Sequence, residues 1–210
     1  MRKSLLVLAV LLIAVSNVNA QIEAGKISVG GTLNVSSNST KYKDGSSTQD
    51  GAKDTQFTFG PQVGYFFSEN LSVGAGLVYQ HDVATSADGE TKNIGNRFIF
   101  SPFGRYHIPL GEKVYLFGEA KLNFGLGSRK TKTDGDTDKI GDLSSLGFTL
   151  SPGIILFPSE RIGIELAFNL LSFDRVADKD PDNGDNKTIR NDFSFGPDLF
   201  SPTLGVQLYF

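Results

Sequence analysis

Residues 113–127, KVYLFGEAKLNFGLG, alternate between apolar and other residues along their whole length. One set of alternate positions is Val, Leu, Gly, Ala, Leu, Phe and Leu, and the opposite set begins Lys, Tyr, Phe, Glu, Lys and Asn. Successive side chains of a β-strand point to opposite faces of a sheet, so a period of two predicts a strand with one apolar face. An amphipathic helix would repeat its apolar positions every three or four residues instead.

The same alternation recurs along the chain and predicts eight strands, whereas no segment after residue 20 has a helical apolar stripe. The strands cover about 25–36, 55–67, 71–81, 95–108, 114–127, 144–157, 161–173 and 199–210. Short connections at 68–70, 109–113 and 158–160 alternate with long polar ones at about 37–54, 82–94, 128–143 and 174–198. This order is typical of consecutive antiparallel strands joined by turns at one end and loops at the other.

A weak repeat supports the strand count. Every second strand carries a proline in its apolar phase, and these prolines are 41, 50 and 50 residues apart: Pro61, Pro102, Pro152 and Pro202. A proline inside a strand removes a hydrogen-bond donor. We therefore expect a shared local irregularity, such as a bulge, at these four positions.

The first twenty residues have the organisation of a secretory signal peptide. Arg2 and Lys3 precede an apolar run at residues 5–15, and Val18 and Ala20 fit the small-residue cleavage site. The run is too short for a transmembrane helix, although a short N-terminal anchor is the alternative. We expect residues 1–20 to be removed and residues 21–210 to form the mature domain. Loss of two basic residues leaves 18 basic and 23 acidic residues, a net charge of −5.

Composition excludes several function classes. The chain has no Cys, which excludes disulfides, a thiol nucleophile and Cys-ligated zinc or iron–sulfur sites. With 20 basic and 23 acidic residues in the full chain it lacks the basic surplus of nucleic-acid-binding proteins, so no nucleic-acid partner is expected.

The apolar face of the strands is rich in Phe, Leu and Ile, whereas the opposite face is mostly Gly, Ser, Thr, Asn and Gln with few charges. Such a polar face suits a crowded lumen better than a solvent-exposed surface. Apolar-out strands of about ten residues with alternating short and long connections are the pattern of a transmembrane β-barrel. A soluble secreted β-barrel is the less favoured alternative. Eight strands enclose a lumen that side chains can fill.

The lumen phase holds six charged residues: Lys26, Arg97, Arg105, Glu119, Lys121 and Glu165. Unpaired buried charges are costly, so we expect these residues to form ion pairs that block the lumen. A polar path for small solutes is the alternative. Matching residues of one face across the short turns predicts that Phe66 faces Ser72, Arg105 faces Phe117 with Glu119 diagonal to it, and Gly153 faces Glu165.

The chain ends with TLGVQLYF, which resembles the C-terminal assembly signal of bacterial outer-membrane barrels. Thr203, Gly205, Leu208 and Phe210 occupy the positions of that motif. The resemblance implies recognition by the barrel-assembly machinery.

Taken over residues 21–210, the chain resembles the small eight-stranded outer-membrane barrels of Gram-negative bacteria, such as the OmpA transmembrane domain, OmpX and OmpW. It is most similar to the "outer membrane protein beta-barrel domain" proteins of Bacteroidetes. The resemblance rests on pattern and implies an all-β fold: a closed eight-stranded antiparallel up-and-down transmembrane barrel. It stops at the barrel, so we expect no cell-wall tether of the OmpA kind.

No arrangement of residues points to catalysis or to a cofactor. His81 and His107 lie toward opposite ends of the predicted strands, and Ser144, Ser145 and Ser151 have no neighbouring His in the sequence or in the predicted pairing. The chain contains no P-loop or dinucleotide motif. Acidic residues alternate at 134–138 and 178–184 as in calcium loops, but neither segment has the full pattern, so we expect solvated loops and no metal site. Divalent cations bridging these loops to lipopolysaccharide are the open alternative.

The sequence therefore predicts an integral outer-membrane protein, exported through the periplasm, with its tight turns in the periplasm and its long loops outside the cell. The expected role is structural or surface interaction, with a lumen filled by polar and charged side chains. The alternative is a narrow porin or a conduit for small solutes or apolar molecules. The expected partners are outer-membrane lipid and lipopolysaccharide and, during insertion, the barrel-assembly machinery. The sequence identifies no partner for the extracellular loops.

Overall fold

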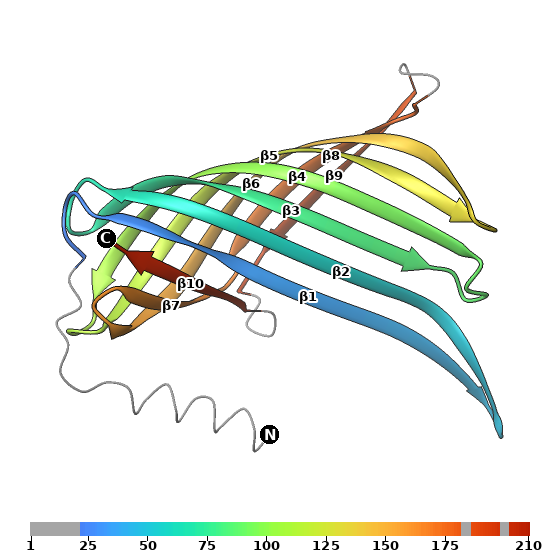
Figure 1. Cartoon of the computed structure of the whole chain (residues 1–210), viewed down its shortest axis with the longest axis horizontal. Coiled ribbons are helices and arrows are strands. Elements are labelled where there is room, and N and C mark those ends of the chain that lie inside the picture. The colour runs from blue at the N-terminus through green and yellow to red at the C-terminus, as the bar shows by residue number, and fades with distance from the viewer. Residues whose placement is uncertain (1–21, 182–185, 198–201) are drawn as a thin grey trace.

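The structure is a computed structural model that describes residues 22–181, 186–197 and 202–210. The predicted signal peptide lies outside these residues. Within them, no helix is long and apolar enough to cross a membrane. Figure 1 shows long, tilted strands that wrap around a common axis, with hairpins projecting beyond one end.

Ten strands make up the fold. Their bounds are β1 Ile27–Asp44, β2 Ser47–Phe66, β3 Leu71–Thr85, β4 Thr91–Pro109, β5 Val114–Thr133, β6 Asp136–Ser159, β7 Ile162–Ala167, β8 Leu171–Lys179, β9 Lys187–Phe195 and β10 Thr203–Tyr209.

The strands close into a ring in which every neighbour is antiparallel. Strands β1 to β6 pair in sequence order, β6 pairs with β7, β7 with β10, and β10 with β1. Strand β8 also pairs with β6, and β9 pairs with β8. Thus β7 and β8 share one position in the ring, and β9 and β10 share another. The prediction of a closed eight-stranded antiparallel barrel is confirmed.

The long polar connections are shorter than predicted, because most of their residues extend the strands into hairpins (Figure 1). Strand β1 runs to Asp44 and β2 begins at Ser47, so the segment expected to be a loop at 37–54 is a two-stranded ribbon. Gly45 and Gly135 have positive φ values of 58° and 96°, which permit the tight turns. In the β3–β4 turn, Ser86 and Glu90 donate hydrogen bonds to the Asp88 carboxylate and hold its pKa below the usual value.

Each of the four prolines lies where the strand pairing is interrupted, but the interruptions differ. Pro61 and Pro102 lie in gaps of the β2–β3 and β4–β5 ladders, but the register is the same on both sides of each gap, so neither is a bulge. Opposite Pro152, three residues between β7 and β8 face two residues of β6, which is a one-residue bulge. Pro202 lies in the break between β9 and β10. The alternation of amide directions along each strand places every proline nitrogen on the side of the next strand around the barrel. The hydrogen bond that is lost is therefore the one to that next strand.

The ring is closed at the end with the short turns, but farther toward the hairpins it is open at one seam. The β1–β10 ladder ends at the pair Thr32 and Gly205. Beyond Thr32, β1 has only β2 as a ladder partner among the described residues, and β9 has only β8. Two exposed strand edges therefore border this seam.

The observed register corrects two of the predicted pairings by two residues. Phe66 faces Ser72 as predicted. Arg105, however, lies directly opposite Glu119 rather than Phe117, and Glu165 faces Ile155 rather than Gly153. The chain turns more tightly than expected at 109–113, where the Leu110 amide donates to the Val114 carbonyl. A slip of two residues keeps every side chain on its predicted face.

The outer surface of the barrel is apolar over a continuous belt. Phe98, Leu126 and Leu77 are 66%, 70% and 62% exposed, and the same phase continues around the ring. The buried residues lie inside the barrel, toward the end with the short turns.

Candidate functional site: the lumen of the barrel

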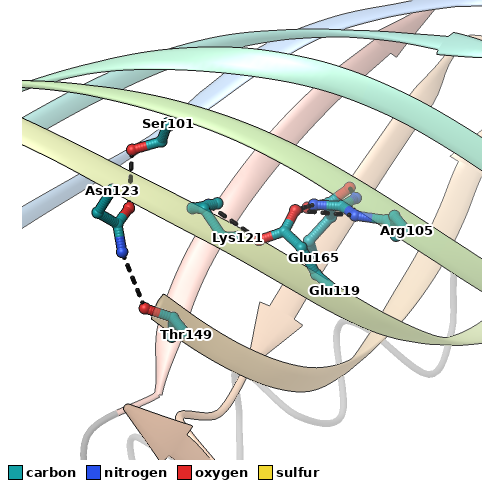
Figure 2. A network of polar contacts seen from close by, with 7 residues as sticks. All are labelled: Ser101, Arg105, Glu119, Lys121, Asn123, Thr149 and Glu165. Atoms are coloured by element: carbon teal, nitrogen blue, oxygen red, sulfur yellow. Dashed lines mark hydrogen bonds and ion pairs between the residues drawn. The ribbon is translucent and has the colours of Figure 1, made fainter. Parts of the chain in front are cut away.

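A network of ion pairs centred on Arg105 crosses the lumen (Figure 2). Arg105 on β4 donates from Nε and Nη2 to Glu119 Oε2 on β5, at 3.1 and 2.7 Å. Its Nη1 donates to Glu165 Oε1 on β7 at 2.6 Å. The three side chains are each less than a tenth exposed. Arg105 therefore braces three strands from within the lumen.

Lys121 and the aromatic rings complete this network. Lys121 Nζ lies 2.9 Å from Glu119 Oε1. The Arg105 guanidinium lies 4.3 Å from the centre of the Phe117 ring, a distance suited to a cation–π interaction. Two cations and two carboxylates make a neutral cluster, which satisfies the requirement that buried charges be paired.

Two of the six predicted lumen charges lie apart from this network. Arg97 is nearer the hairpins, where it donates to Gln80 Oε1 at 2.7 Å and approaches Asp174 at 3.6 Å. Lys26 lies near the end with the short turns and approaches Glu23 at 4.0 Å. The structure thus brings Arg105, Glu119, Lys121 and Glu165 together but separates Arg97 and Lys26 from them.

A second, uncharged polar layer lies beside the ion pairs (Figure 2). Ser101 donates to Asn123 Oδ1 at 2.8 Å, and Asn123 Nδ2 donates to Thr149 at 3.0 Å. These residues join β4, β5 and β6. Sequence reasoning did not single them out, although their inward phase was the available signal.

An aromatic floor lies in the lumen at the end with the short turns, in addition to the polar and charged side chains that the sequence predicts there. Its rings contact one another: Tyr209 lies 4.9 Å from Phe157 and 5.9 Å from Phe66, measured between ring centres. The floor consists of Ile22, Phe66, Tyr115, Phe117, Ile155, Phe157 and Tyr209. The Tyr209 hydroxyl reaches Glu165 Oε1 at 3.5 Å, so the floor adjoins the ion-pair network.

The two histidines do not form a catalytic site with each other. His107 is fully buried between the rings of Phe66 and Phe117, and neither ring nitrogen has a partner among the described residues. His81 lies higher, where it hydrogen-bonds Asn96 Oδ1 at 2.8 Å. Gln207 and Lys113 are also buried, and their terminal polar atoms lack protein partners in the described part of the chain.

The part of the lumen beside the ion pairs offers little room for a ligand. A cavity of about 90 Å³ adjoins the ion pairs and extends to Thr32, Thr203 and Gly205 at the seam. Small-molecule sites are usually roughly 300–1,000 Å³, so this cavity does not fit a typical metabolite. In the described ranges, no group of three or more His, Cys, Asp or Glu residues could hold a metal ion.

The residues of the C-terminal motif lie along β10 and at the chain end. Gly205 faces Thr32 of β1 and Glu165 of β7. Leu208 and Phe210 are exposed on the outer face, at 41% and 64%. The motif thus occupies the strand that closes the ring.

Comparison with solved structures gives barrels of similar size. OprG from Pseudomonas aeruginosa is 16% identical over 92% of this chain and 99% of its own, with a TM-score of 0.51. Ail, the attachment invasion locus protein of Yersinia pestis, is 15% identical over 89% of this chain and 99% of its own, with a TM-score of 0.48. At these identities the likeness to OprG supports the fold alone. No curated protein matches the chain.

The family comparison covers most of the chain. The sequence pattern of the family described as "Outer membrane protein beta-barrel domain" matches residues 5–196. This agrees with the closed antiparallel barrel and its exposed apolar belt. The chain therefore belongs to the outer membrane protein beta-barrel domain family and is an outer-membrane β-barrel protein.

Proposed function

We propose that this protein is a non-conducting, non-enzymatic barrel of the outer membrane with a structural or surface-contact role, which its projecting hairpins perform outside the cell. One observation carries the proposal. The lumen holds two consecutive barriers, the neutral network around Arg105 and the aromatic floor beneath it. A solute entering from the hairpin end would have to displace both.

Planar-bilayer recording tests the absence of a pore. We expect the purified, folded protein to give no discrete conductance steps. An open eight-stranded pore would give steps of uniform size, and such steps from the unmodified protein would contradict the proposal.

Membrane insertion and export have their own tests. We expect the protein to fractionate with outer membranes after osmotic shock and to migrate differently on a gel when folded and when boiled. We also propose that the mature chain begins at Gln21, so N-terminal sequencing should start with Gln-Ile-Glu. A soluble periplasmic fraction would contradict the membrane assignment.

Cysteine labelling tests the orientation. The chain has no natural Cys, so a single introduced thiol reports its own position. Ser46→Cys lies in the β1–β2 hairpin turn and Gly111→Cys lies in the β4–β5 short turn, where a Cβ would meet no atom within 4 Å. We expect an impermeant maleimide to label the first variant on intact cells and the second only after lysis. The reverse pattern would invert the proposed topology.

Passage of small molecules is the second candidate function, and one observation favours it. The lumen cavity reaches Thr32 and Gly205, the last paired residues below the open seam. A solute could therefore enter from the side without crossing the aromatic floor. Swelling of protein-containing liposomes in small sugars or amino acids would support this candidate, and absence of swelling would argue against it.

A further inference from the structure

Four lysines gather on the outer face of the hairpin region. Lys92 on β4 lies directly opposite Lys132 on β5, and Lys130 on β5 lies directly opposite Lys139 on β6. All four are exposed. They therefore occupy two adjacent rows across three neighbouring strands, and we call them the lysine cluster.

The cluster has little acidic compensation within the protein. Like charges that face each other across a sheet repel and destabilise the pairing. Lys139 pairs with Asp142 at 2.7 Å, but the other three lysines form no ion pair with any described residue. Glu90 and Asp136 are nearby in the sequence, but among the described residues they form no ion pair with the cluster. The lysine ammonium groups are therefore available to an external anion.

Two acidic residues of the same region pair with arginines on the inner face. Asp178 pairs with Arg129 and Asp174 approaches Arg97 within the barrel. On the outer face, Asp142 is the carboxylate that pairs with the lysine cluster, so lysines exceed carboxylates there. The net negative charge of the whole chain conceals this local excess.

The cluster lies just above the apolar belt. Leu126, at 70% exposure, is four residues before Lys130 on the same face of β5, which is about 13 Å along a strand. Phe98, the cross-strand partner of Leu126, is 66% exposed on β4. A molecule that contacts both surfaces must have anionic groups attached to hydrocarbon chains.

We propose that the lysine cluster binds the phosphate and carboxylate groups of the lipopolysaccharide that surrounds the barrel. This inference rests on the proposed function, because it requires hairpins outside the cell. The cluster lies several residues beyond the belt, so its ligand must carry charges above the level of a phospholipid headgroup. Lipopolysaccharide carries such charges in its inner core, and several lysines can contact several phosphates of one molecule.

The lysines would also take the place of divalent cations. Phosphates of neighbouring lipopolysaccharide molecules are bridged by such cations, whereas ammonium groups neutralise them directly. Binding at the cluster should therefore persist in the presence of a chelator.

The test uses the full mature chain, folded into phosphatidylcholine vesicles and titrated with rough-type lipopolysaccharide, with the rise in unfolding temperature as the readout. The test variant carries Lys92→Gln, Lys130→Gln, Lys132→Gln and Lys139→Gln. The control carries Lys41→Gln, Lys43→Gln, Lys179→Gln and Lys187→Gln, which removes the same charge elsewhere in the hairpins. A third variant replaces the cluster with arginines.

We expect the cluster variant to need roughly 1,000-fold more lipopolysaccharide for a half-maximal effect, since each of its four surface lysines adds about 1 kcal/mol of attraction to an anionic surface. The control should stay within about threefold of the natural protein, because two of its lysines already lie beside a carboxylate: Lys41 pairs with Asp50, and Lys179 lies opposite Asp142. The arginine variant and a chelator should change little, and dephosphorylated lipopolysaccharide should bind weakly.

Three results would overturn the inference. The first is equal weakening in the cluster variant and the control, which would indicate attraction to charge in general. The second is an equal response to phosphatidylglycerol, which would assign the cluster to phospholipid. The third is an unchanged titration of the cluster variant. If heat-modifiable migration shows that the natural protein does not insert at all, the proposed function fails and this inference fails with it.

Discussion

Arg105 is the residue on which the lumen network depends. It contacts both buried carboxylates, Glu119 and Glu165, so its removal leaves two negative charges with only Lys121 nearby. Breaking a buried ion pair from one side costs about 3–5 kcal/mol, whereas replacing all partners by neutral groups is often close to neutral. We expect Arg105→Met to lower the free energy of unfolding by about that amount.

Urea unfolding in vesicles measures this loss. Because the chain has no Trp, unfolding is followed by tyrosine fluorescence or by gel mobility. The matched control is the quadruple variant Arg105→Met, Glu119→Gln, Lys121→Gln and Glu165→Gln, which also removes the cation that pairs with Glu119. It should recover most of the stability. If the quadruple variant is as unstable as Arg105→Met alone, the ion pairs contribute more than mutual neutralisation.

Gly74 shows how closely the lumen is filled. A Cβ at this position would lie 2.4 Å from Phe103 Cζ and 2.1 Å from the Val63 carbonyl oxygen. Gly118, on the outer face, has no atom within 4 Å of the same position. We expect Gly74→Ala to destabilise the barrel by about 1–3 kcal/mol through overpacking. Gly118→Ala should have little effect in the same unfolding assay, and equal losses would contradict this account.

The sequence predicts whether a strand residue faces the lumen or the outside, but it does not predict which side chains that residue contacts. The alternation placed Arg105, Glu119, Lys121 and Glu165 on the inner face, where the structure has them. It could not indicate that Tyr209 and Phe66 would meet in a floor, because they come from opposite ends of the chain. A period of two specifies the face of a residue and says nothing of its height in the lumen.

Strands were predicted more reliably than their ends. The alternate apolar residues end where the strands extend beyond the apolar belt. The polar residues that follow, such as those around Ser47, therefore resemble loop residues in the sequence. In the structure they continue the ladder, since both faces of an extended hairpin can be solvated. The turn at 109–113 shows the same limit, because alternation permits any slip of two residues and only the turn geometry selects one.

The upper part of β1 provides a prediction at the scale of the element. Near its start, Ile27 exchanges hydrogen bonds with Phe210, so odd-numbered amides of β1 point toward β10 and even-numbered ones toward β2. The pairing of Thr32 with Gly205 still engages the Leu33 amide, but beyond Leu33 the odd-numbered amides have no ladder partner among the described residues. We therefore expect fast hydrogen exchange at Val35 and Ser37 and slow exchange at Asn34 and Ser36.

Solution NMR of the deuterium-exchanged protein in micelles resolves these amides one by one. Below the seam, Val29 and Gly31 serve as internal controls, since they lie in the β1–β10 ladder and should be protected. Uniform protection from residue 33 to residue 37 would mean that a strand pairs across the seam, and the opening would then be absent in solution.

At the scale of the whole molecule, composition takes on a different meaning once the faces are known. High Phe content with 39% hydrophobic residues is divided between a belt on the outer surface and a floor inside the lumen. The charged residues are divided as well, between ion pairs inside the barrel and a cluster with an excess of lysines on its outer face. The barrel thus presents three distinct environments: lipid, solvent above the membrane, and a closed interior.

The proposed closure of the lumen depends on the whole barrel, because the two barriers lie in series. If the Arg105 network and the aromatic floor each block the lumen, removing one leaves the other. We expect neither Arg105→Ala nor the double variant Ile22→Ala with Phe157→Ala to give discrete conductance in planar bilayers. The combination of all three substitutions should open a path, provided that gel mobility shows the folded form. Conductance in Arg105→Ala alone would mean that the floor does not seal the barrel, and a silent triple variant would place the barrier elsewhere in the lumen.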